Sequence, residues 1–180
     1  MIETDRLSLR SWNEADIIPF QKICSDPRVM ATLGPPLDMA ETAALIGRVQ
    51  LLEAEHGHTF WALERSEDAR LIGWCGVIRG TDGPMEGKAE IGWRLAHDCW
   101  GHGYATEAAR ASVDWAFANL ADDAVWAITS AGNRASQAVM ERLGMRRHIE
   151  LDFDHPKLPL GDPLRPHVTF SLERAAWLEI

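Results

Sequence analysis

Residues 89–108 read AEIGWRLAHDCWGHGYATEA, and this stretch decides the fold. The segment from Ala89 to Leu95 has the composition of a β-strand, and Tyr104 begins a run of small apolar residues at helical spacing. Between them, Gly101 and Gly103 allow positive φ angles and a close approach of the backbone to a ligand. Because the first turn of a helix presents unpaired N–H groups and the positive end of its dipole, the stretch predicts a cradle for a pyrophosphate.

Two other glycine-containing phosphate motifs do not fit this stretch. A dinucleotide fingerprint requires a third Gly or Ala where this chain has Thr106, and it requires alternating strands and helices around it. A nucleoside-triphosphatase loop ends in Gly-Lys-Ser/Thr, and that triplet does not occur in the chain. The cradle therefore belongs to another class of phosphate site.

The rest of the chain predicts a mixed domain around this stretch. Period-two alternation and short β-branched or aromatic runs predict seven strands, at residues 6–12, 59–64, 71–78, 89–95, 125–129, 146–153 and 167–172. Caps and apolar stripes predict four helices, which begin after Asn13, Asp38, Gly103 and Asn133. The short links within residues 59–95 imply an antiparallel meander, so the fold class is α/β in the α+β sense.

Composition narrows the class of protein. At 180 residues, with 46% apolar and 25% charged residues, the chain is expected to form one domain spanning residues 1–180. A net charge of −9 argues against nucleic-acid binding, which requires clustered Lys and Arg. Cys24, Cys75 and Cys99 are odd in number and widely spaced, and no membrane span or signal peptide is visible. A cytoplasmic protein without a membrane partner is expected, and a homodimer is left open.

The loop sequence resembles that of the GNAT superfamily of N-acetyltransferases, whose phosphate loop reads Gln/Arg-x-x-Gly-x-Gly/Ala. Gly103 and Ala105 match its last two positions, while Trp100 departs from the usual Arg or polar residue at its start. The form WGxGYATEA is similar to the RimJ/RimL branch, named for ribosomal-protein N-terminal acetylation. Further matches lie at residues 3–10, Asn133-x-x-Ser136, 141–145, 167–172 and Trp177.

The resemblance implies a mostly antiparallel, splayed sheet of about seven strands flanked by about four helices. It also implies acetyl-CoA as the co-substrate, an amine as the acceptor, and direct transfer in a ternary complex. The strand edge at Trp93, Arg94 and Leu95 would pair with the pantetheine arm. The implied pyrophosphate residues are Trp100, Gly101, His102, Gly103, Tyr104, Ala105 and Thr106, and Asn133 and Ser136 would reach the coenzyme from the last helix.

The resemblance identifies the catalytic residues less directly than the residues that bind the coenzyme. An amine must lose its proton before it attacks a carbonyl, and Glu90 resembles the strand glutamate that serves as base in parts of the superfamily. Glu90 fits a solvated strand face equally well. Met140 stands where many members place a proton-donating Tyr, and a thioether cannot donate, so Ser136 or a water it orders is the substitute. Asn133 and Ser136 could also serve only to cap their helix.

Other chemistries receive less support. His97, His102 and His155 could carry protons but fit ordinary loop residues better, and Cys99 has no His paired with it for covalent catalysis. His56-x-His58 lacks a third ligand, so no metal is expected. A catalytically silent acetyl-CoA-binding module and an unrelated nucleotide enzyme remain alternatives. The acceptor is not named by any motif, although residues 26–40 and 154–166 are expected to line its pocket.

Overall fold

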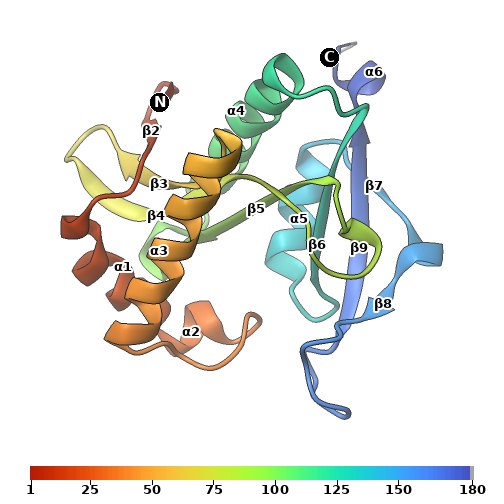
Figure 1. Cartoon of the computed structure of the whole chain (residues 1–180), viewed down its shortest axis with the longest axis horizontal. Coiled ribbons are helices and arrows are strands. Elements are labelled where there is room, and N and C mark those ends of the chain that lie inside the picture. Colours follow the sequence, from red (N-terminus) through yellow and green to blue (C-terminus); the bar gives the residue numbers. More distant parts are fainter. Residues whose placement is uncertain (179–180) are drawn as a thin grey trace.

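A computed structural model describes residues 1–178 and contains one nine-stranded sheet. The strands are β1 (Ile2–Glu3), β2 (Leu7–Arg10), β3 (Phe60–Arg65), β4 (Arg70–Arg79), β5 (Ala89–Leu95), β6 (Ala124–Ser130), β7 (Arg146–Arg147), β8 (Phe153–Asp154) and β9 (Pro166–Glu173). Their order is β1-β2-β3-β4-β5-β6-β9-β7, with β8 paired to β9. The predicted mixed, mostly antiparallel fold class is confirmed (Figure 1).

Six α-helices accompany the sheet within residues 1–178. They are α1 (Ile17–Cys24), α2 (Pro27–Met30), α3 (Met39–His56), α4 (Tyr104–Asn119), α5 (Arg134–Arg142) and α6 (Arg174–Trp177). The predicted Asp38–Glu41 capping box begins α3, and Gly57 ends it with a φ of 74°. None of these helices is both long enough and apolar enough to cross a bilayer.

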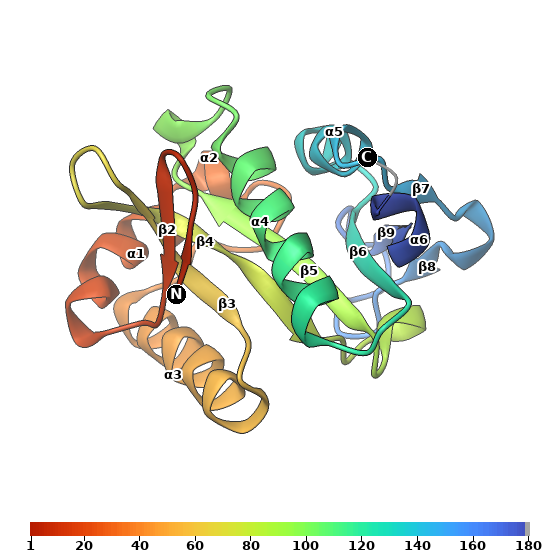
Figure 2. The same ribbon diagram turned by 90° about the horizontal axis from the view of Figure 1, so that it is seen from above.

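The sheet opens at its centre, between β5 and β6. All other neighbouring strands pair antiparallel, whereas β5 and β6 run parallel and pair only at Glu90 and Trp126. Beyond Glu90 the two strands diverge, so residues 91–95 have no strand partner on that edge. Figure 2 shows β5 and β6 separating, with α4 beside the opening. The splay implied by the resemblance is therefore present.

Helices cover both faces of the β4–β5 half of the sheet. Cys75 of β4 faces Ser112 of α4, with the two side chains 3.6 Å apart. The preceding residue, Trp74, packs against Phe20 of α1, with ring centroids 5.2 Å apart. Because successive side chains of a strand point to opposite faces, α4 and α1 lie on opposite sides of the sheet.

The structure corrects the number and continuity of the predicted elements. Residues 146–153 do not form one strand: β7 and β8 are separated by a 3-10 turn at Ile149–Leu151. His148 interrupts the strand because its ring contacts the Ser171 hydroxyl at 2.8 Å, while Ile149 is left 74% exposed. The short elements β1, α2 and α6 were not predicted. Together with the division of one predicted strand into β7 and β8, they turn about seven strands and four helices into nine and six in the described chain.

Candidate active site

A cavity of about 420 Å³ occupies the opening of the sheet. It is bordered by the end of β5, the loop that leads into α4, the helix α5 and the segment around α2. Its lining residues are Val29, Thr32, Leu33, Trp93, Arg94, Leu95, Cys99, Trp100, Gly101, Gly103, Tyr104, Ala105, Thr106, Asn133, Ala135, Ser136, Ala138, Val139 and Arg142. The only charged residues among these are two arginines, although the whole chain carries a net charge of −9. Such a lining favours an anionic ligand.

The loop before α4 presents a row of free amides to this cavity. Gly101 and Gly103 have φ angles of 78° and 84°, which is the left-handed region that glycine tolerates. Within residues 1–178, the N–H groups from Gly101 to Thr106 donate to no protein acceptor, and the first helical bond runs from Glu107 N to Gly103 O. A methyl group at Gly101 would meet no protein atom within 4 Å. The loop therefore fits a diphosphate held by backbone donors.

Trp100 stabilises the loop through a side-chain hydrogen bond. The sequence comparison did not predict this role, since Trp100 departs from the family pattern. Its indole Nε1 donates to the carbonyl oxygen of Leu95 at 3.0 Å, and its own amide donates to His97 O at 3.1 Å. The side chain thus ties the loop to the end of β5. Since the Trp100 amide is already paired, the free donors begin at Gly101.

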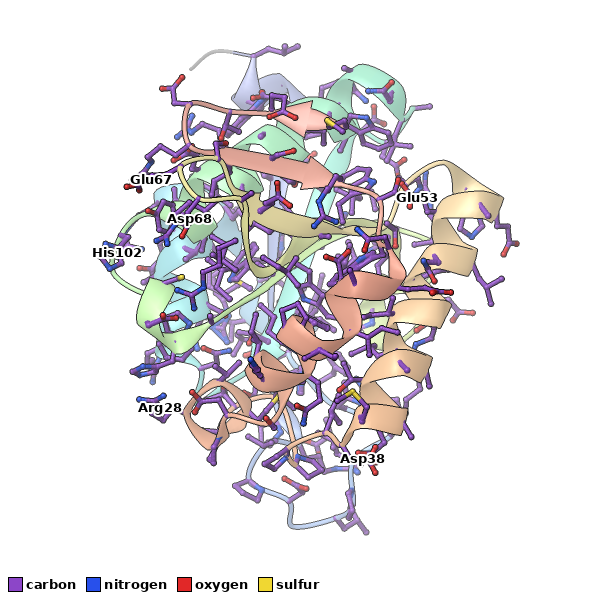
Figure 3. All side chains as sticks on the ribbon, turned by 90° about the vertical axis from the view of Figure 1, so that its left-hand side faces the viewer. Arg28, Asp38, Glu53, Glu67, Asp68 and His102 are labelled. Carbon is purple, nitrogen blue, oxygen red and sulfur yellow. The ribbon has the colours of Figure 1, made fainter. Side chains whose placement is uncertain are left out.

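The N-terminal segment holds the loop from outside the cavity. Arg6 donates through Nη1 to the His102 carbonyl at 3.1 Å and through Nε to Glu107 Oε2 at 2.7 Å. The Thr4 hydroxyl donates to Glu107 Oε1 at 2.6 Å. His102 itself stacks on Tyr104 and points outward at the edge of the molecule (Figure 3). The His102 side chain is therefore outside the cavity, and His102 is not among the lining residues.

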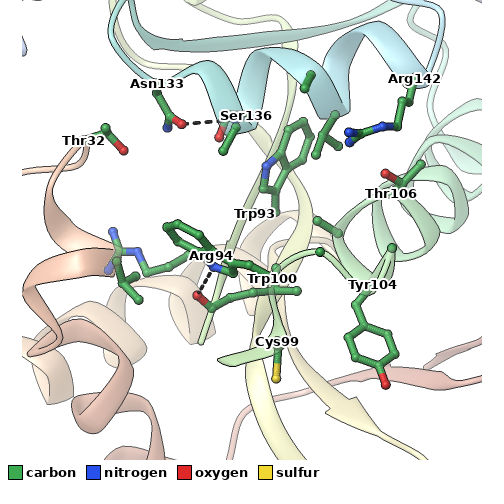
Figure 4. A pocket seen from close by; sticks show the side chains of 18 of the residues that line it. Thr32, Trp93, Arg94, Cys99, Trp100, Tyr104, Thr106, Asn133, Ser136 and Arg142 are labelled. Carbon is green, nitrogen blue, oxygen red and sulfur yellow. Dashed lines mark hydrogen bonds between the residues drawn. The ribbon is translucent and has the colours of Figure 1, made fainter. Parts of the chain in front are cut away.

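Two residues of α5 predicted from the sequence line the cavity together. Asn133 Oδ1 accepts from Ser136 N at 3.1 Å, which is the N-cap bond of the helix. Figure 4 shows both side chains on one side of the Trp93 indole, with Arg142 and Thr106 on its other side. Asn133 is buried, so its amide group is available to a ligand only from the cavity side.

Glu90 lies away from this cavity, where β5 and β6 meet. Its pKa is raised to about 7, because burial disfavours the carboxylate and Asp82 adds a nearby negative charge, while Lys157 acts in the opposite direction. Lys157 Nζ pairs with Asp82 Oδ2 at 2.8 Å, which ties the 154–166 segment to the loop that precedes β5. A carboxyl group with a pKa near neutrality can accept a proton under physiological conditions.

Several sequence candidates are separated from the cavity. Met140 is 2% exposed and packs in the core rather than among the lining residues. His155 lies beside His167, and burial lowers the pKa of its ring. His58 is buried with Nδ1 2.7 Å from Val77 O, as expected of a core histidine. Among residues 1–178, no cluster of three His, Cys, Asp or Glu side chains could hold a metal ion.

Seven lining residues were not singled out in the sequence: Val29, Thr32, Leu33, Ala135, Ala138, Val139 and Arg142. Val29, Thr32 and Leu33 belong to the predicted 26–40 acceptor segment, but no motif marked them individually. The Ser130 hydroxyl donates to Thr32 O at 3.0 Å, which joins the end of β6 to this segment. Arg142 follows a common helical pattern of basic residues near a C-terminus, so its place at the cavity needed the fold.

Comparison with known proteins agrees with this geometry. Residues 6–146 match the acetyltransferase (GNAT) domain family. YkkB of Bacillus subtilis is 32% identical over 145 residues, which are 79% of this chain and 83% of YkkB. An acetyltransferase from Agrobacterium tumefaciens superposes with a TM-score of 0.77 at 29% identity, covering 96% of this chain and 94% of that one.

A more distant structure shares the fold. The spermidine N-acetyltransferase from Vibrio cholerae, solved with CoA and spermine, has a TM-score of 0.75 at 15% identity and covers 97% of this chain and 99% of its own. A splayed sheet with a free-amide loop at a helix start defines a class of acyl-CoA-dependent transferases. The chain belongs to the GNAT family of acetyltransferases, which use acetyl-CoA.

Proposed function

We propose that the protein transfers the acetyl group of acetyl-CoA directly to a primary amine within a ternary complex. One observation carries the proposal: the free amides from Gly101 to Thr106 border a cavity whose charged lining residues are both arginines. This arrangement suits the diphosphate of CoA and leaves the opening of the sheet for its thioester arm. Arg142 supplies a cation on the same side as Thr106 (Figure 4).

The pantetheine arm would run along the edge of β5. Residues 91–95 have no strand partner there, so the edge can pair with the amides of the arm from Trp93 to Leu95 as a neighbouring strand would. A backbone N–H of this edge can also polarise the thioester carbonyl, as in an oxyanion hole. Asn133 and Ser136 then face the arm from α5.

Glu90 is the proposed base. Its raised pKa, about 7, makes the carboxylate a competent acceptor for the proton of an incoming ammonium. The side chain does not line the cavity, so a short chain of waters would carry the proton between the cavity and Glu90. The Phe60 ring packs on Gly92, where an added methyl group would meet it at 2.9 Å, so these waters would pass beside that ring.

The departing thiolate needs little assistance. A thiol with a pKa near about 8.5 leaves tolerably as the anion, and Ser136 or a water that it orders would return the proton. Met140 offers no alternative because it is buried in the core and cannot donate. No covalent acyl-enzyme is proposed, since burial raises the pKa of Cys99, the one cysteine at the cavity.

We further propose membership of the RimJ/RimL branch, on the loop form WGxGYATEA and the Asn133-x-x-Ser136 pair. The single-domain organisation, a cytoplasmic location and a homodimer belong to the same proposal. The branch leaves two acceptor classes open, a protein N-terminus or a small-molecule amine.

The test is a combined turnover and acceptor screen. The protein is incubated with acetyl-CoA and a panel of amines and N-terminal peptides, free thiol is followed over time, and acetylated products are identified by mass spectrometry. Amine-dependent thiol release with a matching acetylated product supports the proposal. Tight CoA binding in calorimetry with no turnover on any amine would instead indicate a binding module.

A further inference from the structure

Arg94 lies at the cavity without an acidic partner. Its Nη1 donates to Cys24 Sγ at 3.1 Å, and its guanidinium lies 4.9 Å from the centroid of the Trp74 ring. Its Nε is buried and has no hydrogen-bond partner within residues 1–178. A guanidinium has five N–H donors and is always charged, so this set of contacts leaves most of its hydrogen-bonding capacity unused.

Two other half-buried arginines have acidic partners, and a third, Arg174, has none among residues 1–178 but donates to the backbone carbonyls of Phe117, Leu120 and Asp122. Arg10 pairs with Asp16 and Glu64, each at 2.8 Å, and Arg79 pairs with Asp122 at 2.7 Å. Arg94 forms no ion pair with any residue of the described chain, 1–178. Its thiol neighbour is no substitute, because burial raises the pKa of Cys24 and keeps it neutral, although Arg94 acts to lower that pKa.

The phosphates of CoA are not the partner of the Arg94 guanidinium, because Arg94 lies on the other side of the cavity. Figure 4 shows Arg94 and Arg142 on opposite sides of the cavity, with Trp93 between them, and Arg94 extends toward the segment that carries Thr32. The free amides of residues 101–106 belong to the Arg142 side. Along β5, Arg94 alternates with Trp93, so its side chain leaves the strand on the face shared with Gly92 and Glu90.

We propose that Arg94 binds an acidic group, a carboxylate or a phosphate, of the molecule that meets the thioester at this end of the cavity. The proposal rests on the function proposed above and names its substrate class. An arginine over an aromatic ring offers a pre-organised fork that fits such groups in a bidentate manner. The same charge disfavours acceptors whose only ionic groups are additional ammonium ions, such as polyamines.

The acidic group can come from either of two substrates. It can belong to the acceptor, whose amine would then point toward the thioester at the free edge of β5. Glu90 lies four strand positions from Arg94, about 13 Å between Cα atoms. It can also belong to the acyl chain of the donor, as in succinyl-CoA. Both sources bring the same chemistry to the guanidinium, and they are separated by experiment.

The test compares matched pairs of substrates that differ in one acidic group. Acceptors are glutamine against glutamine amide, β-alanine against β-alaninamide, and phosphoethanolamine against ethanolamine, each with acetyl-CoA. The donor arm uses succinyl-CoA against acetyl-CoA with the two amides, which have no acidic group. The variants are Arg94→Gln, Arg94→Lys and the control Arg48→Gln, an exposed arginine on α3. Melting temperatures are measured for all of them, with and without CoA.

In the acceptor case, the wild type and the control prefer the acidic amine to its neutral partner in kcat/KM, and R94Q reduces this preference by about tenfold to a hundredfold. R94K falls between them, because it keeps the charge but loses the fork. In the donor case, the same pattern appears with succinyl-CoA. Equal rates for charged and neutral partners in both arms overturn the proposal while leaving the acetyltransferase function intact.

If no amine is acetylated, ligand binding is measured instead through the melting temperature. The acidic and neutral amines are then added to the CoA-bound protein, and the shift in melting temperature is compared between wild type and R94Q. A larger shift with the acidic ligand that disappears in R94Q supports the anion site even if the proposed transfer fails. Equal shifts in both proteins reject it.

Discussion

Arg6 and Glu107 are 101 residues apart in the chain, and their side chains join the N-terminal segment to the first turn of α4. The Arg6 backbone amide also donates to Glu107 Oε1 at 3.1 Å. Partial burial acts to raise the pKa of Glu107, but hydrogen bonds from Thr4 and Arg6 outweigh it and hold the pKa below its ordinary value. A permanent carboxylate thus lies one turn from the proposed diphosphate site, and Arg6 neutralises it.

This pairing predicts that Arg6 supports CoA binding indirectly. In Arg6→Ala, the Glu107 charge is unpaired beside the ligand phosphates and the His102 carbonyl loses its donor. We expect a rise in the dissociation constant for CoA of roughly fivefold, or about 1 kcal/mol, by calorimetry. Arg6→Ala with Glu107→Gln should recover part of the affinity, because the unpaired charge is gone. Equal weakening in the single and double variants would contradict the neutralising role.

A substitution at Gly101 can distinguish a loss of CoA binding from the cost of backbone strain. Gly101→Ala places a Cβ in the left-handed region, which costs about 1–2 kcal/mol, and brings a methyl group to the edge of the cradle. The matched control is Gly57→Ala, since Gly57 has a φ of 74°, also has open space around a Cβ, and lies at the end of α3. Both variants should lose similar thermal stability. Only Gly101→Ala should weaken CoA binding, and equal affinities for CoA would remove the loop from the binding site.

The elements around the phosphate loop were predictable because each has a local signal. Asp38 and Glu41 satisfy each other's backbone groups, Gly57 and Gly144 have the positive φ of helix ends, and β5 has the predicted bounds. Pro19 did not break α1 because it falls in the first turn, where its missing N–H has no helical partner to lose. These features depend on residues close in sequence.

The parts that the sequence did not predict depend on distant partners. At the interruption between β7 and β8, His148 contacts Ser171 of β9. The phosphate loop is held by hydrogen bonds from Thr4 and Arg6 to Glu107. Arg94 was predicted only through its backbone edge, whereas its unpaired side chain becomes visible once Cys24 and Trp74 are placed around it. Pairings across tens of residues have no periodic signature in one chain.

Asn133 has two roles that a graded substitution can separate. Asn133→Ala removes the cap of α5 and should cost about 1 kcal/mol, or a fall in melting temperature of about 2–4 °C. Asn133→Ser keeps a capping oxygen and should restore most of that stability, but it lacks the amide N–H₂ group that faces the cavity. We expect CoA affinity to fall in both variants. Wild-type affinity in Asn133→Ser would limit the residue to capping.

Glu90 predicts a specific pH dependence of turnover. Because its pKa is raised to about 7, kcat at saturating amine should rise as the pH increases toward 7 and level off above it. Glu90→Gln should lower kcat at pH 8 by about a hundredfold or more and abolish this inflection, while CoA affinity stays unchanged. Glu86→Gln, an exposed glutamate on the preceding loop, is the control and should behave as wild type.

Two charged neighbours of Glu90 test its role as the base, because removing them should shift the pH inflection in opposite directions. Asp82 raises the pKa of Glu90 and Lys157 lowers it, so Asp82→Asn should move the inflection to lower pH and Lys157→Met should move it to higher pH. The Lys157 variant also leaves the Asp82 charge unpaired, which adds to its upward shift. If the pH of the inflection is the same in both variants as in the wild type, a group other than Glu90 titrates.

Stability should follow pH in the direction opposite to activity. Between the ordinary value of 4.5 and about 7, the folded protein keeps a proton on Glu90 that the unfolded chain has lost. The free energy of unfolding therefore decreases as pH rises through this window, and above it the buried carboxylate destabilises the fold by at most about 3 kcal/mol. Glu90→Gln removes this penalty, so its melting temperature should exceed that of the wild type by several degrees at pH 8 and match it near pH 4. Thermal denaturation at both pH values, with Glu86→Gln alongside, measures the difference, and an equal melting temperature at pH 8 would mean that Glu90 is solvated rather than buried.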